Sequence, residues 1–584
     1  MTTPIIDKLK IIEELVKLPQ YGIVGLTHNK LVYVSTVEGV RDLWSLDIKT
    51  NEVSRLTTGG IHSVAPVKSK SPLVIYTRDV RSGRELHQIF SINVIDVKEK
   101  VIVDFEPKRI FGISFDGEKI AFSCAGEKEV EIYTAKPEKE YEKVYGVNAV
   151  AIVSSNNKNL IAGYGSFKDP RIFEIFIYNL ENGEFKIYTP KEGASCKPPE
   201  VFNGKILFST NAFGDEKLMI YNYYEDELKE PELSYSDYKK YKFTEYAGYG
   251  WTEDGKIWFT GEINGRTKLF IDGKEIMLPK GFAFNAKVYN DTVYVTWSSM
   301  KMPTRILKID LKKNEIKTLL GANIPEHISK CFGDVKFVKY KSFDGLEIPM
   351  YIFESNIASK PGPAIIYIHG GPWAEVADSW SIFIASLVAS GYHVLAPNFR
   401  GSTGYGEKFR QLDIGDPGGG DLMDIVYARN YAIKIGSAKE DKIAIMGYSY
   451  GGFMTFLATV KHPELWRCGV AGAGITDWDE MYQLSDPLFK QFINMLFAGK
   501  KELWKDRSAI NFADKLKAPL CILHPQNDSR TPLKPVLKYC MKLLENGKTF
   551  ELHIVPDMGH MVIKMDDALK ILFPAIIFLE KYMK

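Results

Sequence analysis

The sequence predicts two domains, an N-terminal seven-bladed β-propeller and a C-terminal α/β domain whose mostly parallel sheet is covered by helices on both faces. The chain of 584 residues is too long for one ordinary hydrophobic core. Residues from about 22 to 320 are short alternating strands and turns, and beyond about residue 332 apolar strands alternate with helical stretches. We therefore expect a helix in residues 1–20, a propeller in residues 21–322 and an α/β domain in residues 323–584.

A repeat of roughly 44 residues divides the first half of the chain into seven similar units. A propeller blade of four strands has this length, and neighbouring blades bury each other's faces and leave only short edges. A pair of ordinary β-sandwiches is the alternative, but it would not need seven similar units. The repeat is read from seven apolar strand starts: Leu31, Leu73, Ile120, Leu160, Ile206, Ile257 and Val293.

An amphipathic helix is predicted before the propeller. Ile5, Leu9, Ile12 and Val16 recur at helical spacing among charged residues, and Pro19 ends the pattern. Charges within this apolar stretch indicate that it is not a secretory signal peptide. We expect the helix to pack on the α/β domain, and an ordinary surface helix is the alternative.

The composition limits the classes of partner. The formal net charge of +2 gives no electrostatic reason to expect nucleic acid or an anionic membrane as a partner, and no run of about 18 apolar residues predicts a membrane span. The six cysteines are scattered singly, which indicates reduced thiols of a cytoplasmic protein and not a zinc or disulfide framework. Glutamine is rare, which is typical of thermophile proteomes but also of biased base composition.

The second half of the chain begins with a predicted hairpin, residues 337–340 and 346–353, around Asp344 and Gly345. Six nearly continuous apolar runs follow, and helical periodicity separates most of them. Such strands are buried on both faces, which predicts a mostly parallel sheet. The six runs are residues 364–368, 393–396, 443–446, 469–471, 520–523 and 550–555.

A nucleophile is predicted at Ser449, in the Gly-x-Ser-x-Gly sequence of residues 447–451. An apolar strand runs up to Met446, and a helical pattern begins at Phe453. A serine on the sharp turn between strand and helix presents its hydroxyl at the top of the sheet. The flanking glycines let the backbone turn tightly.

An acid and a base follow in the order that such a serine requires. Asp528 and His560 each come shortly after a predicted strand, where the functional groups of an open α/β sheet gather. The order serine, acid, histidine is the one found in the α/β-hydrolase fold. His560 can accept the serine proton, and Asp528 can orient the imidazole. Asp557 is the alternative acid, and His524 is interpreted as a structural residue.

Backbone donors for an oxyanion are predicted on two loops. Residues 369–372 (HGGP) end a strand upstream of the serine, where Gly371 is the better candidate of the two glycines. The N–H of Tyr450, directly after Ser449, is the second donor. Both groups would stabilise negative charge on an attacked carbonyl.

These motifs together resemble the prolyl oligopeptidase family of serine peptidases, and within it the acylaminoacyl branch. True prolyl oligopeptidases carry a tyrosine before the two glycines, where this chain has His369. Dipeptidyl peptidases of the family use paired glutamates in the propeller half to bind a free amino terminus, and no such pair is identified. The resemblance rests on five segments: 369–372 (HGGP), 397–406 (PNFRGSTGYG), 447–454 (GYSYGGFM), 524–532 (HPQNDSRTP) and 557–560 (DMGH).

The resemblance also implies residues that bind substrate. Arg530 is expected to bind a substrate carbonyl or carboxylate, with a structural ion pair as the alternative. Trp478, Phe489 and Phe492 are expected to line an apolar specificity pocket, and plain core positions are the alternative. No metal or other cofactor is implied.

The expected activity is that of a serine exopeptidase which removes an N-acylated amino acid from a short peptide, with esterase activity on apolar acyl groups. A broad oligopeptidase, dipeptidyl peptidase or carboxylesterase on the same scaffold is the alternative. A propeller interaction module with a vestigial hydrolase is the alternative from another class. Short N-acylated peptides are the expected partners, nucleic acid and membranes are not, and a homo-oligomer is left open.

Overall fold

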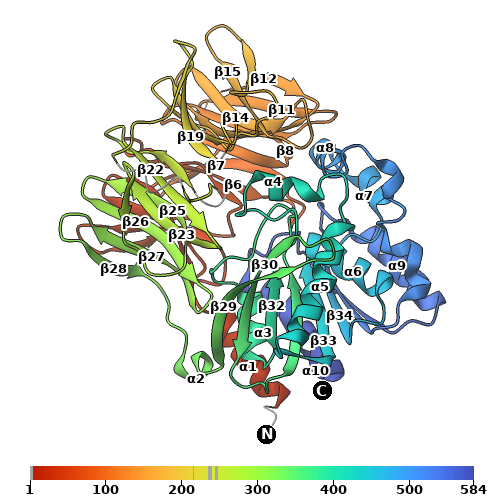
Figure 1. The fold of residues 1–584 in the computed structure, drawn as a ribbon. Helices are drawn as coiled ribbons and strands as arrows, with labels where there is room; N and C mark the ends of the chain where they lie inside the picture. Colours follow the sequence, from red (N-terminus) through yellow and green to blue (C-terminus); the bar gives the residue numbers. More distant parts are fainter. Residues whose placement is uncertain (1–3, 138–139, 215, 235–239, 244–247, 584) are drawn as a thin grey trace.

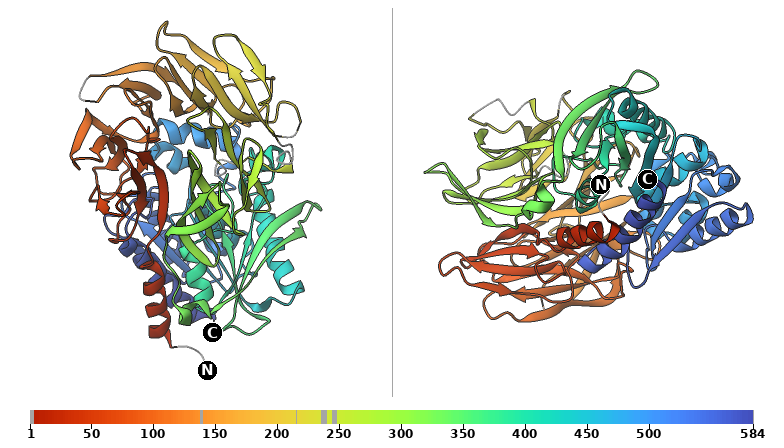
Figure 2. Two further views of the ribbon diagram at one scale, coloured as in Figure 1. Left: turned by 90° about the vertical axis from the view of Figure 1, so that its left-hand side faces the viewer. Right: turned by 90° about the horizontal axis from the view of Figure 1, so that it is seen from below.

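The computed structural model describes the chain except for residues 1–3, 138–139, 215, 235–239, 244–247 and 584. A ring of small sheets stands over an α/β domain, and the N-terminal helix lies at the far end of that domain, close to the C-terminus (Figures 1 and 2). Within the described residues no helix is long and apolar enough to cross a membrane.

Seven four-stranded antiparallel sheets, each of four consecutive strands, form the propeller in the part of the chain that is described. The first three blades contain β1 (Tyr21–Thr27), β2 (Lys30–Ser35), β3 (Asp42–Asp47), β4 (Val53–Arg55); β5 (Ser63–Val64), β6 (Leu73–Asp79), β7 (His87–Asn93), β8 (Glu99–Lys108); and β9 (Ile110–Phe115), β10 (Ile120–Ala125), β11 (Val130–Ala135), β12 (Tyr141–Val147). The other four contain β13 (Val150–Asn156), β14 (Leu160–Ser166), β15 (Glu174–Asn179), β16 (Phe185–Tyr188); β17 (Glu200–Phe202), β18 (Lys205–Thr210), β19 (Lys217–Asn222), β20 (Glu227–Lys229); β21 (Tyr249–Trp251), β22 (Ile257–Ile263), β23 (Arg266–Ile271), β24 (Lys274–Ile276); and β25 (Phe282–Tyr289), β26 (Thr292–Ser299), β27 (Met302–Asp310), β28 (Glu315–Leu320).

The prediction of seven blades is confirmed. All seven predicted strand starts fall at the beginning of the second strand of a blade. That strand is buried on both faces, as in β10 and β22, because neighbouring blades cover it. A continuous apolar run therefore marks it in the sequence.

The ring closes by packing of the first blade against the last. The Ile23 N–H donates to Thr296 Oγ1 at 2.8 Å, and Asn285 Nδ2 donates to the Ile23 carbonyl at 3.2 Å. Each of these two blades is complete in its own four strands. Side-chain contacts, and not an exchanged strand, hold the closure.

An eight-stranded sheet forms the centre of the α/β domain, in the order β29-β30-β32-β31-β33-β34-β35-β36. The first two strands are the predicted antiparallel hairpin, and the strands from β32 onward are parallel. All six predicted apolar runs lie within strands of this sheet. The bounds are β29 (Phe332–Lys341), β30 (Glu347–Ser355), β31 (Gly362–Ile368), β32 (His393–Pro397), β33 (Ala438–Tyr448), β34 (Cys468–Gly472), β35 (Leu520–Pro525) and β36 (Phe550–Val555).

Helices cover both faces of this sheet, as predicted. Helices α3 and α10 share one apolar core with Ile365 and Val470, while α5 and α6 share another with Ile366 and Ile445. Successive strand residues point to opposite faces, so each strand contributes to both cores. The helix bounds are α2 (Glu326–Ser329), α3 (Ile382–Ala389), α4 (Glu407–Arg410), α5 (Gly420–Lys434), α6 (Tyr450–Lys461), α7 (Trp478–Leu484), α8 (Pro487–Leu496), α9 (Leu533–Glu545) and α10 (Met565–Met583).

The N-terminal helix α1 (Ile5–Val16) lies against α10 and α3. Ile12 and Leu15 are buried in the core that α10 and α3 share. Lys8 Nζ donates to Glu580 Oε1 at 2.6 Å, and Tyr392 donates to the same oxygen at 2.7 Å. A buried carboxylate with two donors fixes the register of the helix on the domain.

Candidate active site

Ser449 stands on a strained turn between β33 and α6. Its backbone has φ 60° and ψ −120°, a conformation that costs energy for any residue other than glycine. A side chain on Gly447 would lie 2.4 Å from the Gly451 carbonyl, and one on Gly451 would lie 2.1 Å from the Ile368 oxygen. The Gly-x-Ser-x-Gly spacing is therefore required by the turn itself.

Three side chains from three strand ends meet at this turn. His560 Nε2 lies 2.9 Å from Ser449 Oγ, and His560 Nδ1 lies 2.7 Å from Asp528 Oδ2. An ionised carboxylate only accepts hydrogen bonds, so Nδ1 carries the proton and Nε2 accepts from the serine. The arrangement can remove a proton from the hydroxyl and return it to a leaving group.

The loop of Asp528 keeps its carboxylate ionised. The backbone N–H groups of Arg530 and Thr531 donate to Oδ1, each at 2.9 Å, and Thr531 Oγ1 donates to Oδ2 at 2.9 Å. Burial acts to raise the pKa of Asp528, but the His560 imidazole and these hydrogen bonds outweigh it and hold the pKa below its usual value. A charged, fixed acceptor thus faces the imidazole.

The two alternative residues lie elsewhere in the described structure. His524 is buried, and its Nε2 lies 2.8 Å from the Thr531 carbonyl. Its imidazole therefore supports the loop that carries Asp528. Asp557 is exposed at a turn with φ 56°. Asp528, and not Asp557, is the carboxylate hydrogen-bonded to His560.

The predicted oxyanion donors lie beside the serine. Tyr450 is the first residue of α6, so its N–H has no acceptor within the helix. The loop of residues 369–372 approaches the same turn, because a side chain on Gly370 would come within 3.3 Å of Ser449 Cβ. In the described structure the Gly371 N–H has no hydrogen-bond partner. Both predicted donors are thus free for a ligand oxygen.

The side chains around these donors are fixed. The Tyr450 hydroxyl donates to Asp421 Oδ2 at 2.6 Å. The His369 ring is buried and stacks on Phe399 with ring centres 4.3 Å apart, and its Nε2 lies 2.8 Å from Ser402 Oγ. Burial lowers the pKa of His369 to about 4, so the ring stays neutral. The imidazole supports the loop, while the backbone faces the serine.

The propeller contributes two charged residues that the sequence analysis missed. Glu85 Oε1 lies 2.6 Å from Arg530 Nη2, and the Glu85 carboxylate also pairs with Arg109. Arg109 in turn lies 2.6 Å from Asp486 Oδ2 and donates to Ser529 Oγ at 2.9 Å. No local pattern marks these residues, because their partners lie 377 to 445 positions away in the chain.

The structural ion pair considered for Arg530 is present, since its guanidinium binds Glu85 through Nε and Nη2. The side chain is still 30% exposed. Nη1 has no partner among the described residues. The contact with Glu85 therefore orients the guanidinium and leaves one of its nitrogens available.

The prediction that Trp478 lines a substrate pocket is wrong. Its side chain is 0% exposed and packs between Phe453 and Phe497, with ring centres 5.1 and 5.0 Å away. It is the first residue of α7 and points into the core between this helix and α6. An aromatic residue near a site was not distinguishable from core by sequence alone.

Phe489 and Phe492, on α8, are half-buried at the boundary with the propeller. The Arg109 guanidinium lies 5.1 Å from the Phe489 ring centre. Phe492 packs on Trp373 with ring centres 5.5 Å apart, and Trp373 directly follows residues 369–372. Trp373 was not predicted, although its position one residue past the glycine loop is a signal that could have identified it.

Comparisons with known proteins match both halves of the chain. The profile described as "Prolyl oligopeptidase family" matches residues 379–584, and the profile "Acylamino-acid-releasing enzyme-like, N-terminal domain" matches residues 32–307. Dipeptidyl aminopeptidase BIII of Pseudoxanthomonas mexicana is 32% identical over 304 residues, 49% of this chain and 44% of that protein. Acylamino-acid-releasing enzyme 2 of Oryza sativa subsp. japonica is 29% identical over 232 residues, 38% of this chain and 30% of that protein. The matches thus span less than half the length of these curated relatives.

Solved structures match over nearly the whole chain. The acylaminoacyl peptidase of Pyrococcus horikoshii has a TM-score of 0.73 at 18% identity and covers 98% of this chain and 97% of its own. A puromycin-hydrolyzing peptidase of Mycobacterium tuberculosis has a TM-score of 0.83 at 15% identity and covers 98% of this chain and 96% of its own. At these identities the likeness shows the fold.

The chain thus combines a propeller with an α/β domain that carries a serine on a strand-to-helix elbow. One of the two profiles matches the propeller half of the chain and the other matches the α/β half. This chain belongs to the prolyl oligopeptidase family.

Proposed function

We propose that this peptidase removes an N-acylated amino acid from the blocked end of a short peptide. The observation that carries the proposal is the state of Glu85, the propeller carboxylate paired with the Asp528 loop. A free α-ammonium group needs an available carboxylate, but Arg530 and Arg109 already neutralise Glu85. A blocked amino terminus carries no charge and needs no such partner.

The reaction begins with attack of Ser449 Oγ on the carbonyl carbon of the acylated first residue. His560 Nε2 takes the hydroxyl proton as the new C–O bond forms, and Asp528 stabilises the imidazolium. The N–H groups of Gly371 and Tyr450 donate to the carbonyl oxygen as it gains negative charge. Because these donors are fixed before substrate binds, little reorganisation opposes the step.

The peptide bond then breaks. His560 transfers its proton to the departing amine, which leaves an ester between Ser449 and the N-acyl amino acid. Water enters, gives a proton to His560 and attacks the ester carbonyl. The imidazolium returns that proton to Ser449 Oγ, and the N-acyl amino acid is released.

Recognition of the blocked residue follows from the remaining groups. The unpaired Nη1 of Arg530 is suited to donate to the carbonyl of the acyl group. Phe489, Phe492 and Trp373 offer an apolar surface for the side chain of the first residue. The ring of blades over the α/β domain favours short or unfolded peptides, and apolar esters fit the same acyl site.

All six cysteines are buried and free in the structure. Free thiols are typical of a reducing compartment. We therefore propose a cytoplasmic location, and a fusion to a redox-sensitive reporter in the source cell would test it.

Paired peptides test the proposed specificity. The same tetrapeptide with phenylalanine first is offered with an acetyl group and with a free amino terminus. The acetylated form is expected to give a kcat/KM at least about 10-fold higher, because an uncompensated buried ammonium group is costly. Ser449→Ala is the control for contaminating peptidases. A preference for the free amino terminus would assign the chain to dipeptidyl or aminopeptidase chemistry instead.

A further inference from the structure

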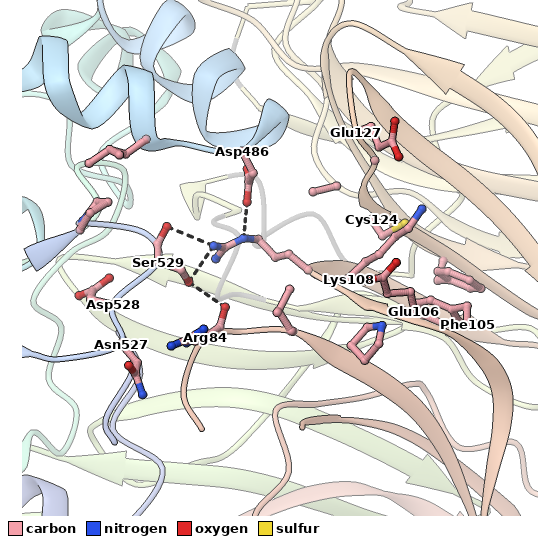
Figure 3. Close-up of a pocket in the computed structure, with 18 of the residues that line it drawn as sticks. Arg84, Phe105, Glu106, Lys108, Cys124, Glu127, Asp486, Asn527, Asp528 and Ser529 are labelled. Atoms are coloured by element: carbon pink, nitrogen blue, oxygen red, sulfur yellow. Dashed lines mark hydrogen bonds and ion pairs between the residues drawn. The ribbon is translucent and has the colours of Figure 1, made fainter. Parts of the chain in front are cut away.

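A large cleft lies between the propeller and the α/β domain, beside the residues described so far. Its volume is about 1100 Å³. Labelled residues of the second and third blades, including Phe105, Lys108 and Glu127, face Asn527 and Ser529 of the α/β domain across it (Figure 3). The proposed reaction at Ser449 makes no use of this space.

The loop that carries Asp528 forms part of the wall of the cleft. Asp528 and Ser529 both belong to its lining, although the Asp528 carboxylate itself is turned toward His560. Arg109 also belongs to the lining and joins the propeller to Asp486 and Ser529. A chain lying in the cleft therefore contacts the loop that carries Asp528 and lies beside Arg109.

Aromatic rings form the propeller wall of the cleft. Phe105 and Tyr133 each stack on Phe122, with ring centres 5.7 and 5.1 Å apart. Tyr141 packs at an angle on Phe105 and Tyr133 at 5.8 and 5.9 Å, and it is 41% exposed. Such a wall accepts apolar and aromatic side chains without a strict sequence requirement.

Charges of both signs surround these rings. Arg84 and Lys108 lie in the lining together with Glu106 and Glu127. A mixed rim of this kind does not favour a polyanion, which requires one sign of charge. It suits a peptide, whose backbone and side chains offer donors, acceptors and both charges.

The size of the cleft favours a chain of several residues. Sites for single small ligands measure about 300–1,000 Å³. One acylated amino acid fills only part of 1100 Å³, and the apolar surface at Phe489 and Phe492 already provides for it. Because Asp528 and Ser529 belong to the lining, a peptide substrate is favoured as that chain.

We propose that this cleft is a secondary binding site for the peptide substrate, which holds a segment remote from the scissile bond against Tyr141, Tyr133 and Phe105. Arg109 lines the cleft beside that segment. The proposal rests on peptide hydrolysis at Ser449, the coarser part of the proposed function, and not on the preference for a blocked terminus. Among unfolded peptides that can enter, it makes those long enough to reach the cleft better substrates than shorter ones.

A substrate series tests the proposal. Peptides that share one cleavage position are prepared short and extended by six residues on either side, each with acetylated and free amino termini. In the wild-type protein one direction of extension raises kcat/KM. In Tyr141→Ala the ratio of kcat/KM between extended and short peptides falls about 3- to 10-fold, the effect of one aromatic contact. The matched control is Tyr224→Ala, a tyrosine 56% exposed on the fifth blade, which leaves the ratio unchanged.

The outcomes separate this proposal from the proposed function. The ratio compares extended and short peptides that carry the same amino-terminal group. A preference for free amino termini therefore does not change it. An unchanged ratio in Tyr141→Ala, or an equal loss with short and extended peptides, overturns the cleft site. A changed sedimentation coefficient with an unchanged ratio assigns the cleft to a second copy of this chain and also overturns it. Binding of the extended peptide to Ser449→Ala, measured by fluorescence anisotropy, must weaken in the double variant with Tyr141→Ala.

Discussion

Asp528, the acid of the proposed triad, is held in place by the hydrogen bonds that its carboxylate oxygens accept. Asp528 receives hydrogen bonds from two backbone N–H groups and from Thr531, in addition to the imidazole. These donors orient the carboxylate. Burial acts to raise the pKa of Asp528, but His560 and the Thr531 N–H lower it below its usual value. His560 is thereby fixed in the tautomer that can accept the proton of Ser449.

Asp528→Asn is expected to lower kcat by about 10³- to 10⁴-fold, because the amide donates to Nδ1 and places the imidazole proton on Nε2. Steady-state hydrolysis of a p-nitrophenyl ester measures the effect. Asp557→Asn serves as the matched control, since Asp557 is exposed and next to the same histidine loop. A loss below about 10-fold in Asp528→Asn would show that another carboxylate orients His560.

A second carboxyl group responds to pH in the opposite direction. The carboxyl oxygens of Glu375 and Glu262 are buried beneath Gly404. Burial, and then the charge of Glu262, raise the pKa of Glu375 well above its usual value. The unfolded chain loses this proton near the ordinary glutamate pKa of 4.5, while the folded protein keeps it. The free energy of unfolding therefore falls as the pH rises above that value.

Glu375→Gln is expected to remove this penalty. The Tm of the variant minus that of the wild type should become more positive between pH 5 and pH 8, as measured by differential scanning calorimetry. Glu347→Gln is the control, because that carboxylate is 62% exposed. A Tm difference that does not change with pH would mean that Glu375 is ionised in the folded protein.

At the scale of elements, α1 shows how an amphipathic pattern becomes a docked helix. Ile12 is 0% exposed in the core with α10 and α3, while Ile6, on the same helix, is 64% exposed. The apolar stripe alone left open whether the helix packs on its own chain or lies on the surface. The Lys8–Glu580 pair, 572 positions apart, is the contact that no local pattern contains.

Ile12→Ala is expected to lower the free energy of unfolding by about 2–5 kcal/mol, since it leaves a cavity in this core. Ile6→Ala is expected to stay within about 0.5 kcal/mol. Urea unfolding followed by tryptophan fluorescence compares the two variants. Equal small effects would place α1 away from the α/β domain in solution.

The difference between local sequence patterns and contacts distant in the sequence explains which features were predictable. Strands such as β10 and β22 are marked in the sequence by a buried apolar run. The elbow at Ser449 is marked by two glycines, at positions where any side chain would clash with the backbone. Glu85 and Arg109 have no local signature, because their roles arise only where the propeller docks on the α/β domain. The prediction that Trp478 lines a pocket was wrong for a related reason, since aromatic residues of a pocket and of a core have the same sequence pattern.

At the scale of the whole molecule, a propeller turn supports both loops of the proposed active site. Asn527 Nδ2 donates to the Ser82 carbonyl at 2.7 Å. A side chain on Gly83 would lie 2.3 Å from the Gly559 nitrogen, one residue before His560. The position of the imidazole therefore depends on how the two domains dock.

Gly83→Ala is expected to lower kcat/KM by about 10- to 100-fold, because the added methyl group displaces the His560 loop. Gly193→Ala is a matched control, since Gly193 also has positive φ, 76° against 88°, but no atom within 4 Å of the added carbon. Ester hydrolysis measures both variants. Equal activities would separate the geometry of the site from domain docking.

The central claim is that Ser449 carries an N-acyl amino acid during turnover. The most direct test is mass spectrometry of the protein quenched within milliseconds of mixing with an excess of acetyl-phenylalanine p-nitrophenyl ester and acetyl-phenylalanyl peptide in separate runs. We expect an acetyl-phenylalanyl adduct on the fragment containing Ser449, absent in Ser449→Ala. Rapid release of acetyl-phenylalanine from both substrates with no adduct on Ser449, or an adduct on another residue, would contradict it.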